Sequence, residues 1–573
     1  MYQKIIFCFL LSITSLNAQV LFSEEASSLG CANTSYGTGV YGGGIAFYDF
    51  DGDGWDDLTI SSDEGLPVRF YRNVNGQFVL VDLGINDLQE NQTVQWVDFD
   101  NDGDSDLFTT SVHDDNRLYE NNGQMQFTNI TFEAGLQIIN NWSFGSSWGD
   151  YNNDGLLDLF LTSHRGPGSG YSNKLFRNNG NGTFTDVSVQ AGILQDGYYT
   201  FCAAFFDYNK DGWQDIYVAS DHSPDNHLYH NNGDGTFTEV GNTTGTGISI
   251  DAMSTTIDDA NNDGYLDIYV TNTSAGNVFF ENNTNGTFSD MASANGTLMQ
   301  SWSWGAVFLD GSNNGFKDLY VSSWEVDPAV GLTSAYYYND GSGNYTIPTG
   351  SGLYNDHAES FGNAIGDINN DGYPDIAVLN QEPHDIFLYR NLSAGNNNWI
   401  KVKLEGTESN RQGIGSWIEI SVNGESQYNY TLCGEGYLGQ NSSYEFFGIG
   451  DATEIDYVKV TWLSGIVDII DNPAINTHIT VTEGLGLGTQ DGDSLVTFRI
   501  SPNPANDRVS ISVSSEMIGS PLKIHNVNGG LVQETVIDSS LSEIFLPEFS
   551  SGVYFVTLEN NKHSITKKLL INN

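Results

Sequence analysis

Residues 49–58 read DFDGDGWDDL, and six further segments of the same kind follow along the chain. Successive copies start 49, 52, 57, 52, 51 and 57 residues apart. The later copies begin at Asp98, Asp150, Asp207, Asp259, Asp310 and Asp367. A repeat of about fifty residues is typical of a propeller or of an array of modules. We number the seven Asp-rich loops one to seven in chain order.

Each loop belongs to a larger unit of short strands. An apolar run precedes it and a β-rich run follows, and then comes a phrase such as LYHNNGDGTFTEV from Leu228. The Asn-Gly and Asp-Gly pairs in that phrase indicate hairpin turns, so a unit predicts four antiparallel strands, which is one propeller blade.

The count of outer strands favours a closed ring. The last outer strand is missing after loop seven, and a segment of that type stands at residues 20–30, before loop one. The sequence therefore predicts an all-β chain whose main part, residues 19–396, is a seven-bladed β-propeller with calcium loops. An open string of independent calcium modules is the alternative.

Composition limits the classes of function. The 573 residues carry a formal net charge of −53, with 73 acidic and 20 basic side chains, while 39% of residues are hydrophobic. So strong a negative charge excludes general binding to nucleic acid or anionic membranes. No apolar stretch is long enough for a transmembrane helix, and the length predicts two to four domains.

The Asp-rich loops have the ligand chemistry of a calcium site. Oxygen side chains stand at positions one, three and five, glycine stands at position six, and Asp stands at position nine. Hard Ca²⁺ takes six to eight such oxygens, with a backbone carbonyl at position seven. Solvated Asp-rich turns are the alternative, and Mg²⁺ fits less well. Loop six has only two carboxylates, so its occupancy is doubtful. The predicted ligands, with position seven acting through its carbonyl, are Asp49, Asp51, Asp53, Trp55 and Asp57; Asp98, Asp100, Asp102, Asp104 and Asp106; Asp150, Asn152, Asp154, Leu156 and Asp158; Asp207, Asn209, Asp211, Trp213 and Asp215; Asp259, Asn261, Asp263, Tyr265 and Asp267; Asp310, Ser312, Asn314, Phe316 and Asp318; Asp367, Asn369, Asp371, Tyr373 and Asp375.

These loops, the strands before them and the N-G-x-G-T-F phrases resemble FG-GAP repeats, also called VCBS repeats, over residues 20–391. The resemblance implies up to seven Ca²⁺ ions in the loops that join the first and second strands of the blades.

Two further regions follow the repeats. The phrases NRQGIGSWIEI from Asn410 and GYLGQNSSYEFFGIG from Gly436 resemble the ASPIC/UnbV domain over residues 397–484, which also follows such repeats in cartilage acidic proteins. A His is expected before Phe446, where this chain has Glu445. We expect a small β-sandwich that caps the propeller.

Both ends of the chain indicate that the protein is exported. After a Gly-rich linker at residues 485–494, residues 495–573 resemble the type IX secretion C-terminal sorting domain and are also expected to form a small β-sandwich. The resemblance implies the type IX secretion machinery as a partner. Residues 1–18 read as a signal peptide, with a buried N-terminal strand as the alternative. Together these features predict a secreted or cell-surface protein.

Catalytic motifs are not evident. We find no G-x-S-x-G, H-E-x-x-H or phosphate-loop sequence. Several histidines fall in loops that antiparallel alternation places opposite the Asp-rich loops, and His164 with Arg165 is the best polar pair for a polyanion. We therefore expect a non-catalytic protein for adhesion or for glycan or protein binding. A calcium-dependent polysaccharide lyase is the alternative.

Overall fold

The structure is a computed structural model. It describes residues 20–39, 41–138, 141–195, 197–222, 225–325, 327, 331–354, 356–393, 397–485, 487–488, 498–501, 508–513, 517–526, 530–539, 541–546, 549–550, 552–559 and 564–571. The predicted signal peptide and most of the predicted linker lie outside these residues. The chain divides into two compact units, and the boundary in the sequence lies between Gly488 and Thr489.

The first unit contains seven four-stranded sheets among the described residues, each with its strands hydrogen-bonded in antiparallel order. We number these sheets by the loop that each one contains. Sheets one to three are β2 (Ile45–Tyr48), β3 (Asp57–Ile60), β4 (Arg69–Asn73) and β5 (Phe78–Val81); β6 (Asn91–Val97), β7 (Asp106–Ser111), β8 (Arg117–Asn121) and β9 (Phe127–Asn129); β10 (Ser146–Gly149), β11 (Asp158–Leu161), β12 (Lys174–Asn178) and β13 (Phe184–Asp186).

Sheets four to six continue the pattern, and one-turn helices follow three outer strands. These elements are β14 (Tyr199–Phe206), β15 (Asp215–Asp221), β16 (His227–Asn231), β17 (Phe237–Glu239) and α2 (Gly241–Thr244); β18 (Thr256–Asp258), β19 (Asp267–Val270), β20 (Val278–Asn282), β21 (Phe288–Asp290) and α3 (Ala292–Asn295); β22 (Ser303–Leu309), β23 (Asp318–Ser323), β24 (Ala335–Asn339) and β25 (Tyr345–Thr346). The third helix, α1 (Ala26–Leu29), follows the N-terminal strand.

Sheet seven joins the two ends of the repeat region. Its strands are β26 (Ser360–Gly366), β27 (Asp375–Asn380), β28 (Phe387–Asn391) and the N-terminal β1 (Phe22–Glu24). Strand β1 pairs antiparallel with β28, and Phe22 lies opposite Asn391. The N-terminal strand thus completes the last sheet, as the sequence predicts.

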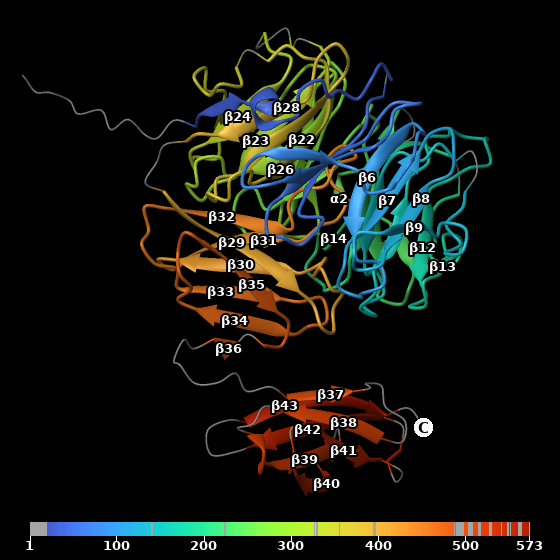
Figure 1. Cartoon of the computed structure of the whole chain (residues 1–573), viewed down its shortest axis with the longest axis vertical. Helices are drawn as coiled ribbons and strands as arrows, with labels where there is room; N and C mark the ends of the chain where they lie inside the picture. Colours follow the sequence, from blue (N-terminus) through green and yellow to red (C-terminus); the bar gives the residue numbers. More distant parts are fainter. Residues whose placement is uncertain are drawn as a thin grey trace, which may run out of the picture. The chain divides into compact units, whose positions relative to one another are not determined.

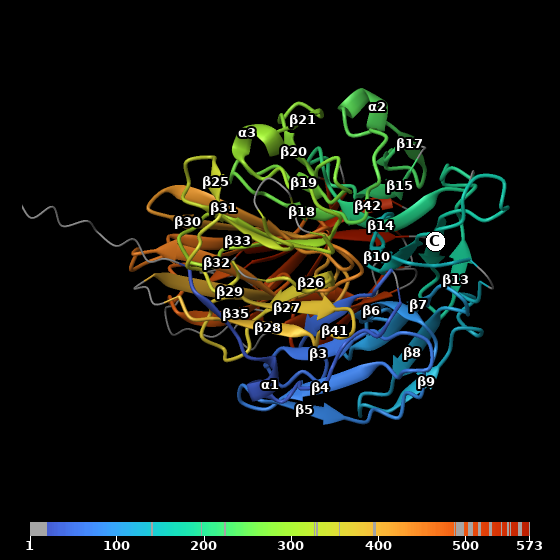
Figure 2. The ribbon, with the colours of Figure 1, turned by 90° about the horizontal axis from the view of Figure 1, so that it is seen from above.

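The first strands of successive sheets pack against one another. Contacts join β2 to β6, β10 to β14, β18 to β22, β22 to β26, and β26 back to β2. Figure 2 shows the sheets following one another from blue through teal and green to yellow. The arrangement is that of a β-propeller-like fold, with the apolar clusters lying between neighbouring sheets.

Two more sheets complete the first unit and share one apolar core that includes Ile400, Ile418 and Phe447. Figure 1 shows them in orange below the other sheets of this unit. One sheet has the order β32-β29-β35 and the other β31-β30-β33-β34-β36. Their strands are β29 (Asn398–Glu405), β30 (Trp417–Val422), β31 (Glu425–Tyr430), β32 (Tyr444–Gly450), β33 (Tyr457–Thr461), β34 (Val467–Asp471), β35 (Thr477–Thr482) and β36 (Leu487–Gly488).

The segment between β31 and β32 runs among the inner strands of the seven sheets, and we call residues 433–442 the plug. The Trp148 amide donates to the Cys433 carbonyl at 2.9 Å, and the Phe47 amide donates to the Gln440 carbonyl at 2.9 Å. Tyr437 is fully buried against Phe201 and Trp304. From the sequence we expect residues 397–484 to form a separate domain. The structure places them in the same compact unit as the seven sheets.

The second unit has its own apolar core, which includes Ile511, Leu522 and Val556. Its described strands form sheets of order β37-β38-β41 and β40-β39-β42-β43. They are β37 (Phe498–Ser501), β38 (Arg508–Val513), β39 (Pro521–Asn526), β40 (Leu531–Val536), β41 (Leu541–Phe545), β42 (Gly552–Glu559) and β43 (Ser564–Ile571). Within the described part of the chain, no helix is long and apolar enough to cross a bilayer.

Candidate metal centres

The seven Asp-rich loops share one backbone conformation, which the Asp at position one organises. In loop one, Asp49 Oδ1 accepts from the Asp53 amide at 3.0 Å, and Oδ2 accepts from the Gly54 amide at 3.0 Å. The same two bonds recur in the other six loops at 2.6–3.2 Å. The glycine at position six has φ between 80° and 99° in every loop, which explains the residue type.

The Asp at position nine is the first residue of the second strand and is buried in every loop. Asp57 shows the pattern: Oδ2 accepts from the Phe50 amide at 3.2 Å, and Oδ1 accepts from the Asn73 amide at 2.7 Å. Equivalent pairs of bonds occur in the other six loops. Position nine therefore ties the loop to the third strand of its own sheet.

Positions three and five lie nearer the surface, and oxygens from several positions converge. One oxygen each from Asp49, Asp51 and Asp53 lies within 4.8 Å of the others, and the same holds for Asp98, Asp100 and Asp106. At position three, Ser312 Oγ and Asn369 Oδ1 are shielded from solvent and have no hydrogen-bond partner among the residues that the structure describes. Unsatisfied buried oxygens at these points suit a cation ligand set.

Burial raises the pKa of several loop carboxyls at positions one and nine. It brings the pKa of Asp98, Asp150 and Asp259, all at position one, to about 7. At position nine, burial raises the pKa of Asp57 and Asp106 to about 9. Repulsion between carboxylates of the same loop adds to the effect. A divalent cation would offset this cost, so the residues present fit Ca²⁺.

Neighbouring loops are joined by the residue at position four, which the sequence analysis did not single out. Its φ is positive in every loop, between 53° and 74°. In five loops it is Asn, and its Nδ2 donates to the carbonyl of the position-six glycine in the next loop at 2.8–3.1 Å. One of these bonds runs from Asn370 to Gly54 and links loop seven to loop one. The recurrence of Asn at this position was the signal available in the sequence.

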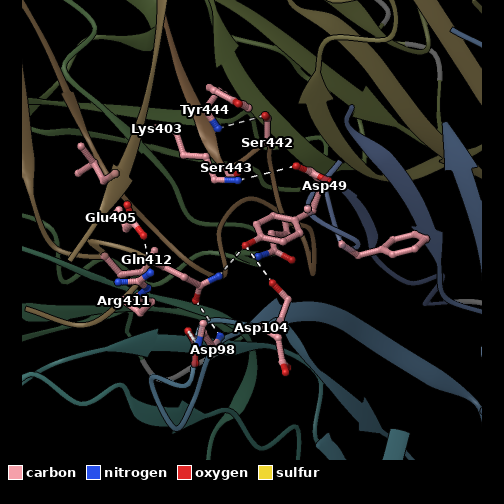
Figure 3. A pocket seen from close by; sticks show the side chains of 18 of the residues that line it. Asp49, Asp98, Asp104, Lys403, Glu405, Arg411, Gln412, Ser442, Ser443 and Tyr444 are labelled. Atoms are coloured by element: carbon pink, nitrogen blue, oxygen red, sulfur yellow. Dashed lines mark hydrogen bonds and ion pairs between the residues drawn. The ribbon is translucent and has the colours of Figure 1, made fainter. Parts of the chain in front are cut away.

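The region of residues 397–484 contributes cations to the loops. Lys401 is 1% exposed, and its Nζ donates to Asp367 Oδ2 at 2.8 Å and to Asn370 Oδ1 at 3.0 Å. The Lys403 ammonium lies 3.8 Å from Asp49 Oδ2, the position-one carboxylate of loop one (Figure 3). These lysines connect β29 to loops seven and one.

On the opposite side of the sheets lie His164 and Arg165, the pair that the sequence analysis singled out. His164 is 5% exposed, and its ring centroid lies 4.2 Å from that of Phe201. Burial lowers the pKa of His164 to about 3, so the imidazole is neutral at physiological pH. His164 therefore offers no positive charge to a polyanion, whereas the guanidinium of Arg165 lies 4.4 Å from the Trp142 ring centroid. Asp221, His222 and Asp251 form a further cluster that sequence reasoning missed.

Three family comparisons match successive parts of the chain. The FG-GAP-like repeat family matches residues 49–109, 98–161, 150–218, 207–270 and 259–321, so loop seven lies beyond the matched residues. The family described as ASPIC and UnbV matches residues 406–487. The secretion system C-terminal sorting domain matches residues 499–572, which indicates type IX sorting and a cell-surface or extracellular location.

Individual relatives are distant. Cartilage acidic protein 1 of Xenopus tropicalis is 26% identical over 136 residues, which are 23% of this chain and only 20% of that protein. Among solved structures, BBS1N in complex with ARL6DN is 11% identical with a TM-score of 0.37, covering 63% of this chain and 94% of that one. The extracellular domain of the BT4673 one-component system of B. thetaiotaomicron is 11% identical with a TM-score of 0.31, covering 90% of this chain and 75% of that one. Residues 49–321 thus match the FG-GAP-like repeat family, residues 406–487 match the ASPIC and UnbV family, and residues 499–572 match the secretion system C-terminal sorting domain.

Proposed function

We propose that this protein is a calcium-binding, seven-bladed β-propeller of the cell surface or extracellular space, and that it is non-catalytic and binds a glycan or protein ligand. The observation that carries the proposal is the sevenfold recurrence of one oxygen-rich loop whose carboxylates at positions one and nine are buried. Seven loops that share the same hydrogen bonds favour one common ligand. Seven unrelated acidic turns would not be expected to share them.

The residues that would hold Ca²⁺ are those at positions one, three, five and nine, with the carbonyl at position seven. The ion would neutralise carboxylates that are otherwise buried together, and it would hold the loop rigid. Loop six supplies two carboxylates, Asp310 and Asp318, with Ser312 and Asn314 in place of the others. We expect this loop to bind the ion more weakly than the other six.

Closure of the ring is supported by three links between sheets seven and one. Strand β1 pairs with β28 before the chain enters sheet one. The Asn370 amide donates to the Gly54 carbonyl at 2.9 Å, and the Asn73 amide donates to the Ile368 carbonyl at 2.9 Å. These contacts favour a closed ring over an open string of modules.

Calcium binding is tested by measuring stoichiometry and thermal stability of the same preparation. We expect six to seven ions for each chain, and a melting temperature that falls by tens of degrees in chelator. Mass action gives about 2.7 kcal/mol for each site at a hundredfold excess over Kd. Replacing Asp49 and Asp51 with Asn should remove one ion, while Asp114→Asn, at an exposed site outside the loops, should remove none. A melt that is the same in calcium and in chelator would refute the metal assignment.

Binding and catalysis are separated by one incubation. The protein is mixed with a panel of acidic polysaccharides, and the absorbance of unsaturated products is followed. We expect none, together with retention of the protein on at least one glycan of an array. Release of unsaturated oligosaccharides would instead support the lyase alternative.

A further inference from the structure

The junction between loops one and two differs from the other six. At five junctions the position-four Asn donates a hydrogen bond to the next loop, as described above. Between loops four and five this position is Lys210, whose ammonium lies 4.5 Å from the Trp417 ring centroid and 5.2 Å from that of Tyr265. In loop one it is Gly52, which has no side chain to reach loop two.

A cavity of about 520 Å³ lies at this junction. Gly52 and Gly103, from the two loops, line it on one side, and Lys403 and Ser443, from the ASPIC and UnbV region, line it on the other. Position seven of loop two is Asp104, whereas the other six loops carry Trp, Leu, Tyr or Phe there. Both departures from the repeat, Gly52 and Asp104, therefore fall in the wall of one cavity, whose side chains Figure 3 shows.

Three polar groups in the wall have unfilled hydrogen-bonding capacity. The Lys403 ammonium is 3.8 Å from its nearest carboxylate oxygen, and no hydrogen bond to it is found among the described residues. Ser443 Oγ and Asp104 Oδ1 are shielded and have no hydrogen-bond partner within the described part of the chain. By contrast, Gln412 is engaged: its Oε1 accepts from the Asp98 amide, and its Nε2 donates to the Tyr48 hydroxyl. The wall thus holds one cation in a long ion pair with Asp49, one hydroxyl and one carboxylate acceptor.

We propose that this cavity binds an acidic sugar residue, a uronate unit of a larger glycan. The inference rests on the proposed function as a glycan-binding protein and names the site and the class of ligand. Lys403 would take the sugar carboxylate, Ser443 would donate to a ring or hydroxyl oxygen, and Asp104 would accept from a hydroxyl. A volume of about 520 Å³ lies within the range of small-ligand pockets.

The decisive variant is Gly52→Asn. Gly52 has φ of 74°, which Asn tolerates, and nothing lies within 4 Å of an added Cβ. Because Asn stands at this position in five other loops, the variant should fold, and its side chain should reach toward loop two and narrow the cavity. Lys210→Asn makes the same kind of change at the distant junction and is the matched control. Lys403→Gln removes the cation of the wall.

The probe is tri-galacturonate, with its fully methyl-esterified form as the neutral counterpart, titrated calorimetrically in calcium. We expect the unmodified chain to bind the acid, with binding at least tenfold weaker in Gly52→Asn and in Lys403→Gln and within twofold in Lys210→Asn. Calcium stoichiometry and melting temperature measured on each variant show that the loops are intact.

Each of the other possible results would refute one named part of the proposal. Equal binding by Gly52→Asn and the unmodified chain would place the glycan elsewhere and refute the cavity, while the proposed function would stand. Equal binding of the methyl ester would refute the role of Lys403 and the uronate class. No binding of tri-galacturonate by the unmodified chain would refute the ligand class, and a glycan array without any retained glycan would refute the proposed function itself.

Discussion

At the scale of single residues, asparagines outside the metal positions hold neighbouring sheets together. The Asn that ends the third strand of a sheet donates from Nδ2 to the position-two carbonyl of the preceding loop in five sheets. Asn178 is an example: it donates to the carbonyls of Phe99 and Leu157 at 2.8 and 3.1 Å. These side chains are buried, so each bond replaces one that water would otherwise make.

Replacing Asn178 with Ala should destabilise the first unit by about 3 kcal/mol, because two buried carbonyls lose their donor. Asn179, its exposed neighbour, is the control, and Asn179→Ala should change stability by less than about 0.5 kcal/mol. The measurement is urea unfolding in calcium. Equal effects of the two substitutions would contradict the role given to the buried asparagine.

A second residue-scale prediction concerns Lys401, which is buried against Asp367. Lys401→Met leaves that carboxylate without its ammonium, so we expect a loss of about 4 kcal/mol in chelator. The loss should be smaller in calcium if an ion in loop seven neutralises Asp367 in place of the lysine. Lys403→Met, at a half-buried site, should cost less in both conditions. An equal loss with and without calcium would argue against an ion in loop seven.

At the scale of elements, β1 is the strand whose place depends on the most distant partner. It pairs with β28 across more than 360 residues of sequence, and its Phe22 is buried with Tyr336 and Tyr389. Arg390 also donates to Glu25 Oε2 at 3.1 Å, just after the strand. The N-terminal segment therefore covers the edge of sheet seven.

Deleting residues 20–30 should expose the edge of β28 and remove the buried Phe22, so we expect aggregation or a large loss of stability. Light scattering and thermal melting of the purified chain measure this. Replacing exposed Leu21 with Ser leaves the strand in place and is the control. A soluble deletion variant with an unchanged melt would favour an open array over a closed ring.

At the scale of the whole molecule, the seven sheets and the ASPIC and UnbV region form one folding unit. The plug donates or accepts hydrogen bonds with inner strands of several sheets, and Gln440 bonds the Trp96 amide and carbonyl at 2.7 and 2.8 Å. The Tyr437 hydroxyl donates to the Tyr41 carbonyl at 2.7 Å. Removing this segment would leave buried polar groups of the sheets without partners.

A chain that ends at Asn391 should therefore be insoluble or should melt much lower than one that ends at Gly488, although both contain all seven loops. The longer chain should fold and bind calcium as the full-length protein does, since Gly488 ends the first compact unit. Circular dichroism melts of the two truncated chains make the comparison. Similar melting temperatures would show that the plug is dispensable.

The pH dependence of stability also belongs to the whole molecule, because the same shift recurs in most of the loops. Burial raises the pKa of loop carboxyls such as Asp98 and Asp150 to about 7, above that of the unfolded chain. The folded state then holds more protons between about pH 4 and 7, so stability without calcium falls as pH rises through that window. With calcium, ionised carboxylates are the binding form, so the gap between melts in calcium and in chelator should widen from pH 5 to 8. A gap that stays constant would contradict the assignment of these carboxyls to metal sites.

The sequence alone predicted the features that depend on local order. Four-strand units, the glycine at position six and the converging loop oxygens follow from turn chemistry and from a period that repeats within about fifty residues. The N-terminal strand was also predictable, because the sequence lacks an outer strand after loop seven and has one extra strand of that type before loop one. The three family resemblances were predictable from short phrases, and the comparisons confirm them.

Tertiary structure alone decided what lies between the repeats. The plug among the inner strands, the lysines of β29 on loops one and seven, and the burial of His164 depend on contacts between residues that are 34 to more than 350 positions apart. Such contacts leave no periodic trace in the chain, since each one occurs once. The cavity beside Gly52 is of the same kind: the sequence shows a glycine where other loops have Asn, but only packing shows that nothing else fills the space.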